Sequence, residues 1–109
     1  MIKTLQFGKL VRDNVPEIIV GRGEAATWHV AEEEEYERLL REKLLEEVAE
    51  ALADPTVTEF ADILEVIDAM AHLKGLTFED VLKTKKERAE KRGGFAGRMI
   101  LDTADEMKK

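Results

Sequence analysis

Residues 32–74 form the longest amphipathic region of the chain and read EEEEYERLLREKLLEEVAEALADPTVTEFADILEVIDAMAHLK. Apolar side chains recur in both halves of this region with the spacing of one helical face. Asp54 and Pro55 separate the halves, because Asp suits a helix N-cap and Pro suits the first helical position. We therefore expect two long helices, over residues 32–53 and 55–74, joined by a tight turn as an antiparallel hairpin.

The chain before this hairpin predicts only short elements. Residues 9–23 favour a short helix or turn, which Pro16 interrupts and which Gly21 and Gly23 close. Residues 25–30 are too few for a helix and favour a strand or an extended arm.

The chain after the hairpin predicts one further helix. Gly75 fits the position that follows a helix C-terminus. Thr77 with Asp80 resembles a capping box and predicts a third helix that ends at Arg92, before a pair of glycines. Residues 99–101, Met-Ile-Leu, favour a short strand or a segment packed on the core.

The length and composition favour one helical domain over residues 1–109. Hydrophobic residues make up 44% and charged residues 38% of the chain, a balance too apolar for disorder. A hairpin plus one helix buries little apolar surface on its own. We therefore expect an all-α helical bundle, built on an antiparallel hairpin and a third helix and completed by dimerisation, with possible short strands near the termini.

Charge and composition also exclude several classes of protein. A net charge of −7 argues against binding a nucleic-acid polymer, which requires a basic surface. The absence of cysteine excludes disulfide scaffolds, thiolate zinc sites and cysteine nucleophiles. No apolar run reaches the length of a membrane span, and residues 1–5 lack the features of a signal peptide. We expect a cytoplasmic protein with no membrane partner.

Four acidic residues fall on the apolar side of the two long helices. At about 100° per residue, Glu47 and Glu50 lie in the apolar arc of the first helix. Glu59 lies inside the corresponding arc of the second helix, and Asp62 lies at its edge. Burying several carboxylates together is costly, and the nearest basic residue on either helix is Lys43. A hard divalent cation, Mg²⁺, Mn²⁺ or Ca²⁺, is the better compensating partner.

The alternative is that these acids are ordinary surface residues of glutamate-rich helices. The histidines do not support a different metal site, since neither His29 nor His72 forms the Glu-x-x-His pair of a ferritin-like di-iron centre. Both read as surface or packing residues. Trp28 could stack on a base, but a place in the core is the more ordinary reading.

Three segments together resemble a known family. Glu46-Glu47-x-x-Glu50 followed by Glu59-x-x-Asp62 resembles the EExxE…ExxD signature of the all-α nucleoside triphosphate pyrophosphohydrolases, the superfamily of MazG, dimeric dUTPase and phosphoribosyl-ATP pyrophosphohydrolase. Residues 9–17, KLVRDNVPE, resemble the KLVRDKIPE opening of a phosphoribosyl-ATP-pyrophosphohydrolase-like branch. Residues 92–95 match its RGGF motif. The resemblance covers about residues 7–100.

The chain departs from the pattern of that branch in three places. Asn14 replaces a usual Lys, and Arg88 stands where Lys is expected. The first change removes a positive charge, whereas the second keeps the charge and alters its shape. The interval between Glu50 and Glu59 is also short for the family. These departures bear on substrate choice rather than on fold.

The resemblance implies hydrolysis of a nucleoside triphosphate to a monophosphate and pyrophosphate. It implies that Glu47, Glu50, Glu59 and Asp62 hold Mg²⁺, or Mn²⁺, and that Glu46 assists them. The reaction requires charge neutralised on the phosphates and a water placed in line with the scissile bond. A carboxylate can accept the proton of that water, and Glu47 and Glu50 are both candidates.

Basic residues near both ends of the chain are candidates for contacts with the substrate phosphates. They are Lys9, Arg12, Lys85, Arg88 and Arg92, of which the resemblance favours Lys9, Arg12, Arg88 and Arg92. Two other functions stay open at this point. One is a non-catalytic helical interaction module whose acids form ion pairs across a dimer. The other is a hydrolase of a different phosphoanhydride, such as phosphoribosyl-ATP.

Overall fold

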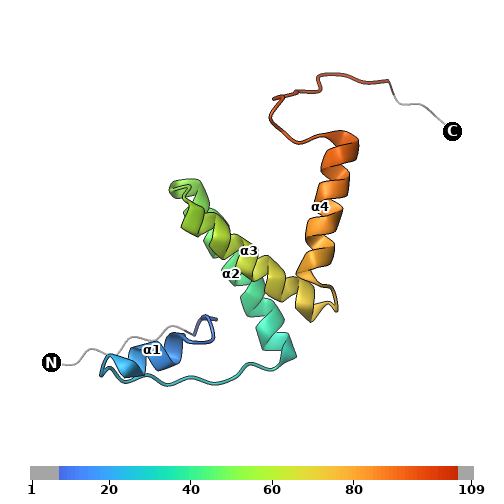
Figure 1. Cartoon of the computed structure of the whole chain (residues 1–109). Helices are drawn as coiled ribbons and strands as arrows, with labels where there is room; N and C mark the ends of the chain where they lie inside the picture. Colours follow the sequence, from blue (N-terminus) through green and yellow to red (C-terminus); the bar gives the residue numbers. More distant parts are fainter. Residues whose placement is uncertain (1–7, 106–109) are drawn as a thin grey trace. The chain divides into compact units, whose positions relative to one another are not determined.

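The computed structural model of the protein describes residues 8–105, in which the regular secondary structure is helical and irregular segments connect and follow the helices (Figure 1). That part contains four helices and no strand, which confirms the all-α class. The chain divides into two compact units, one ending at residue 78 and the other beginning at residue 79. The helices are α1 (Val15–Gly21), α2 (Glu33–Ala53), α3 (Val57–Leu73) and α4 (Phe78–Arg92).

Helices α2 and α3 form the expected hairpin and carry the core of the first unit (Figure 1). The apolar residues that are buried lie on these two helices; they are Leu40, Ala51, Val66 and Ala71. Glu47, which is 6% exposed, is buried among them. The core consists mostly of small or medium side chains, so the two helices bury little apolar surface against each other. One carboxylate lies inside this core.

The turn between α2 and α3 differs from the expectation at its cap. Asp54 does not cap α3 but closes α2, since its backbone N–H donates to the carbonyl of Glu50 at 2.9 Å. Thr56 is the N-cap of α3, and its hydroxyl oxygen accepts a hydrogen bond from the N–H of Glu59 at 3.2 Å. The prediction that Pro55 occupies the first helical position is therefore wrong by two residues. Thr56 has extended backbone angles that let its side chain reach the third helical N–H.

A proline explains where α1 begins, and a glycine explains where α3 ends. Pro16 lies in the first turn of α1, where a missing N–H costs nothing, so it begins the helix rather than interrupting it. Gly75 follows the C-cap Lys74 of α3 with φ of +74°, the left-handed conformation that glycine adopts without strain. The expected end of the second long helix is confirmed.

The short strands expected near the termini do not form in residues 8–105. Residues 25–30 are irregular, and so are residues 99–101, whose side chains are largely exposed rather than packed on a core. A strand requires a partner for its backbone groups, and no second strand is present in this range to provide one. Residues 1–5, on which the expectation of no signal peptide rests, lie outside the described residues.

No helix in residues 8–105 combines the length and the apolar character that crossing a membrane requires.

The Thr56 cap gives a test of the hairpin. Thr56→Ala removes the acceptor of the Glu59 N–H and should lower the free energy of unfolding by about 1 kcal/mol. Urea unfolding followed by circular dichroism measures the change. Thr58→Ala, which alters an exposed threonine inside the same first turn, is the control. Equal stability of the two variants would show that Thr56 does not cap α3.

Candidate metal centre

Three carboxylates from the two long helices converge at one place on the hairpin. Glu47 and Glu50 come from α2, three residues apart and therefore on one face, and Glu59 comes from the first turn of α3. One oxygen from each side chain lies within 4.8 Å of one oxygen from each of the others. Glu47 is buried, Glu59 is half-buried and Glu50 is exposed, so the group has a buried side and a side open to solvent.

Two oxygens of this group are buried without a hydrogen-bond donor. They are Oε2 of Glu47 and Oε2 of Glu59, and neither has a partner within residues 8–105. An unsatisfied buried acceptor costs about 1–3 kcal/mol, more when it carries charge. The donor set consists of carboxylate oxygens alone, which suits a hard divalent cation of the Mg²⁺ type. The residues present therefore fit the cation that the sequence predicts.

The pKa of the Glu47 carboxyl is raised above its ordinary value. Burial is the largest cause, followed by the negative charge of Glu50, and Asp62 acts in the same direction. The ammonium of Lys43, 3.4 Å from Oε1 of Glu47, lowers this pKa and offsets the rise in part. Lys43 thus compensates the charged form of Glu47 only in part.

Asp62, the fourth predicted ligand, is not one of the three converging carboxylates. Its Oδ1 accepts a hydrogen bond from Nη2 of Arg12 at 2.7 Å. Arg12 lies in the segment before α1 and is 50 residues away in the sequence. Helical periodicity placed Asp62 at the edge of the apolar arc, but it gave no information about a partner so distant along the chain.

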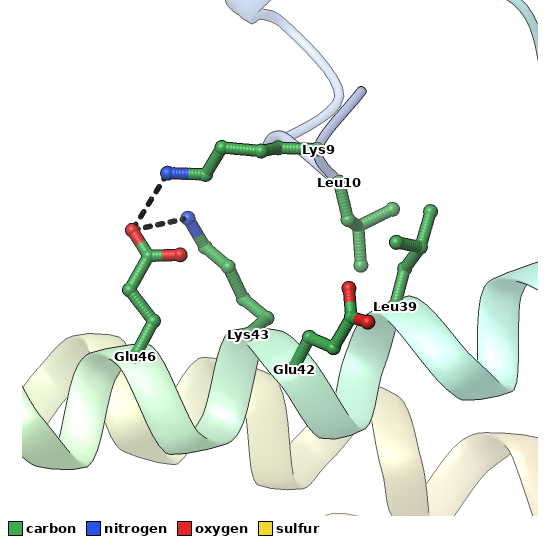
Figure 2. Close-up of a pocket in the computed structure, with 6 residues that line it drawn as sticks. All are labelled: Lys9, Leu10, Leu39, Glu42, Lys43 and Glu46. Carbon is green, nitrogen blue, oxygen red and sulfur yellow. Dashed lines mark hydrogen bonds and ion pairs between the residues drawn. The ribbon is translucent and has the colours of Figure 1, made fainter. Parts of the chain in front are cut away.

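Glu46 is held by two lysines (Figure 2). Nζ of Lys9 donates to Oε1 of Glu46 at 2.8 Å, and Nζ of Lys43 lies 4.0 Å from the same oxygen. The hydrogen bond to Lys9 lowers the pKa of Glu46, and the same bond raises the pKa of Lys9. The two lysines and Glu46 line a small pocket together with Leu10, Leu39 and Glu42.

The predicted phosphate-binding residues thus fall into two groups. Lys9 and Arg12 lie against the acids of the hairpin, each in an ion pair with one of them. Arg88 and Arg92 lie on α4, mostly within the second unit, and are exposed there, as is Lys85. Their role in substrate binding stays a prediction.

The aromatic and histidine residues lie outside the carboxylate group. Trp28 is 58% exposed, so the expectation that it packs in the core is wrong for this chain. Nε2 of His29 is 2.8 Å from Glu35, and Nδ1 of His72 is 3.3 Å from Asp68. Both histidines are exposed side chains with a local acidic partner, so they are surface residues rather than packing residues.

Sequence reasoning named Lys43 as the nearest base but did not assign it to the site. The signal that could have done so is its spacing, because Lys43 and Glu47 are four residues apart on one helix.

Comparison of the chain with models of protein families, with curated proteins and with solved structures found no match.

The raised pKa of Glu47 predicts how its replacement changes stability with pH. Between the unfolded and the folded pKa, the folded chain retains a proton that the unfolded chain has released, so stability increases as the pH falls through this range. Above the folded pKa the charged carboxylate destabilises the fold. Glu47→Gln should therefore be more stable than the wild type near neutral pH, by a margin that shrinks as the pH falls.

Urea unfolding with EDTA at a series of pH values measures this margin. Glu65→Gln removes an exposed carboxylate from α3 and controls for the loss of one negative charge. A wild-type protein more stable than Glu47→Gln at neutral pH would contradict the expectation, since it would mean that the chain alone compensates the buried charge.

Proposed function

We propose that the protein is a Mg²⁺-dependent nucleoside triphosphate pyrophosphohydrolase of the MazG-like kind, acting in the cytoplasm on canonical or non-canonical nucleotides. The observation that carries the proposal is the convergence of Glu47, Glu50 and Glu59, with two buried oxygens that have no donor within residues 8–105. The family resemblance of the sequence supplies the reaction. The reaction products are a nucleoside monophosphate and pyrophosphate.

The three converging carboxylates would hold the cation, and Asp62 would join them with the oxygen that Arg12 leaves free. When bound, Mg²⁺ supplies positive charge to the phosphate oxygens and polarises the scissile phosphoanhydride. Mn²⁺ has similar ligand preferences and would serve as a substitute.

Glu50 is the better candidate for the group that accepts a proton from the attacking water. It is exposed, whereas Glu46 and Asp62 are each held in an ion pair by a basic side chain. Glu47 is buried beside Lys43, so water reaches it less readily. A carboxylate that is open to solvent and beside the phosphate site can take the proton as the water attacks.

Lys9 and Arg12 would bind phosphate oxygens that the cation leaves uncompensated. Both lie beside the carboxylates, and both are about half exposed, so a phosphate can reach them without unfolding of the hairpin. Arg12 suits this role because its planar fork can hold two oxygens at once. The family resemblance also assigns Arg88 and Arg92 to phosphate binding, which stays a prediction from the sequence.

We also propose that the protein assembles with a second copy of itself. Leu45, Val48 and Leu52 form an exposed stripe on α2, with spacings of three and four residues. Val57, Phe60 and Leu64 form a similar exposed stripe on α3. A hairpin with so small a core gains stability if a second hairpin covers these stripes and completes a four-helix bundle.

Release of pyrophosphate tests the proposed reaction. Nucleoside triphosphates, canonical and damaged, should yield pyrophosphate with Mg²⁺ and none with EDTA. Glu50→Gln should lower turnover by about a hundredfold or more while leaving the helical circular dichroism spectrum intact. Glu65→Gln, on the same hairpin but outside the carboxylate group, is the matched control.

Two outcomes would point elsewhere. Release of pyrophosphate from phosphoribosyl-ATP alone would assign the enzyme to a different phosphoanhydride. No release from any substrate with Mg²⁺ or Mn²⁺ would leave a non-catalytic helical module.

Sedimentation velocity tests the proposed assembly. The wild type should sediment as a dimer or larger species, because the apolar stripes are then covered. Leu52→Glu places a charge on a side chain that is 81% exposed in the single chain and should shift the protein to a monomer. Val30→Glu alters an exposed residue away from the stripes and should not change the mass. A monomeric wild type would refute the proposal.

A further inference from the structure

Lys43 lies one helical turn before Glu47 on α2, and Figure 2 shows its side chain reaching toward the carboxylate of Glu46. Its Nζ is 3.4 Å from Oε1 of Glu47 and 4.0 Å from Oε1 of Glu46. The side chain is only 23% exposed, less than Lys9 at 46% or Arg12 at 57%. Lys43 is therefore the most sequestered of the three cations beside the acids.

The acids of this part of the hairpin outnumber the cations that form ion pairs with them. Five carboxylates lie in this region, those of Glu46, Glu47, Glu50, Glu59 and Asp62. Within residues 8–105, three side-chain cations pair with members of this set, and they are Lys9, Arg12 and Lys43. These five acids therefore outnumber the cations paired with them by two; Glu42, which lines the same pocket as Lys9 and Lys43, pairs with Arg38 instead.

The three cations differ in which acids they hold. Lys9 pairs with Glu46 and Arg12 pairs with Asp62, and both of these acids lie outside the three converging carboxylates. Within residues 8–105, Lys43 is the cation whose ion pair includes one of the three. A change at Lys43 therefore alters the charge next to the carboxylate group more directly than a change at Lys9 or Arg12.

We propose that Lys43 is the internal counter-ion of the carboxylate group formed by Glu47, Glu50 and Glu59, and that its ammonium competes with a divalent cation for Glu47. The inference rests on the proposed function, because it concerns the same carboxylates. In the cation-free chain the ammonium reduces the repulsion between the buried Glu47 and its acidic neighbours. A divalent cation that binds Glu47 must do so beside this positive charge, which weakens its binding.

Competition between Lys43 and the cation predicts a different change in cation affinity from the other roles that Lys43 could have. If Lys43 positioned Glu47 for the cation, its removal would weaken cation binding. If it were an ordinary surface ion pair, its removal would change little. If it competes with the cation, its removal strengthens binding. Charges of +2 and +1 a few ångströms apart repel each other enough to change affinity about tenfold, even at the dielectric constant of water.

The experiment measures binding of Mn²⁺ to the full chain without nucleotide, by calorimetry and by the electron paramagnetic resonance signal of free Mn²⁺. Lys43→Met keeps the length of the side chain and removes its charge, and should bind Mn²⁺ about tenfold more tightly than the wild type. Lys43→Arg keeps the charge and should bind more weakly than Lys43→Met, close to the wild type.

The matched control is Lys74→Met. Nζ of Lys74 is 2.9 Å from Oε1 of Glu37, so this change removes one positive charge and one ion pair from the same hairpin, away from the carboxylate group. Its affinity for Mn²⁺ should equal that of the wild type. Tighter binding of Mn²⁺ by both Met variants would show that net charge causes the effect and would overturn the proposed role of Lys43.

The remaining outcomes separate this inference from the proposed function. Wild-type binding of Mn²⁺ with equal or weaker binding by Lys43→Met would overturn the role of Lys43 and leave the metal centre in place. No binding by any variant would overturn both. If Lys43→Met fails to fold, as judged by circular dichroism, Lys43→Gln removes the same charge and carries the same expectation.

Discussion

The buried carboxylate of Glu47 is the constraint on which the arrangement of the hairpin depends. It lies among the few buried residues of the α2–α3 contact, where little water can solvate its charge. Burial and the nearby Glu50 raise its pKa, so the fold opposes the charged form. A small core that includes such a group loses stability unless positive charge is brought to it. The positions of the neighbouring cations are consistent with that need.

Positive charge reaches the acids from two parts of the chain. Lys43 comes from the same helix, whereas Lys9 and Arg12 come from the segment before α1 and join it to α2 and α3 through ion pairs. These exposed ion pairs contribute little stability individually. Their importance lies in placing cations next to the acids of the hairpin. The same side chains would then serve both the cation-free and the substrate-bound protein.

The secondary structure was predictable where periodicity alone determines it. The two long helices and the third helix begin and end within about two residues of their expected positions, because an amphipathic pattern over several turns specifies a helix. Two predictions that rested on the character of single residues were wrong. Asp54 precedes Pro55 and resembles a cap, but Thr56 has the extended backbone that capping requires. Trp28 is apolar enough for a core, but the segment that carries it packs too little to bury it.

The sequence by itself determined which side of each helix carries Glu47, Glu50 and Glu59, because side chains three or four residues apart share a helical face. It therefore predicted that these acids face the partner helix. Only the tertiary structure decided that these three converge within 4.8 Å while Asp62 is held by Arg12 and Glu46 by Lys9. The reason is physical: periodicity acts over a few residues, whereas these ion pairs join residues 50 and 37 positions apart, which meet only when the hairpin and the N-terminal segment fold together.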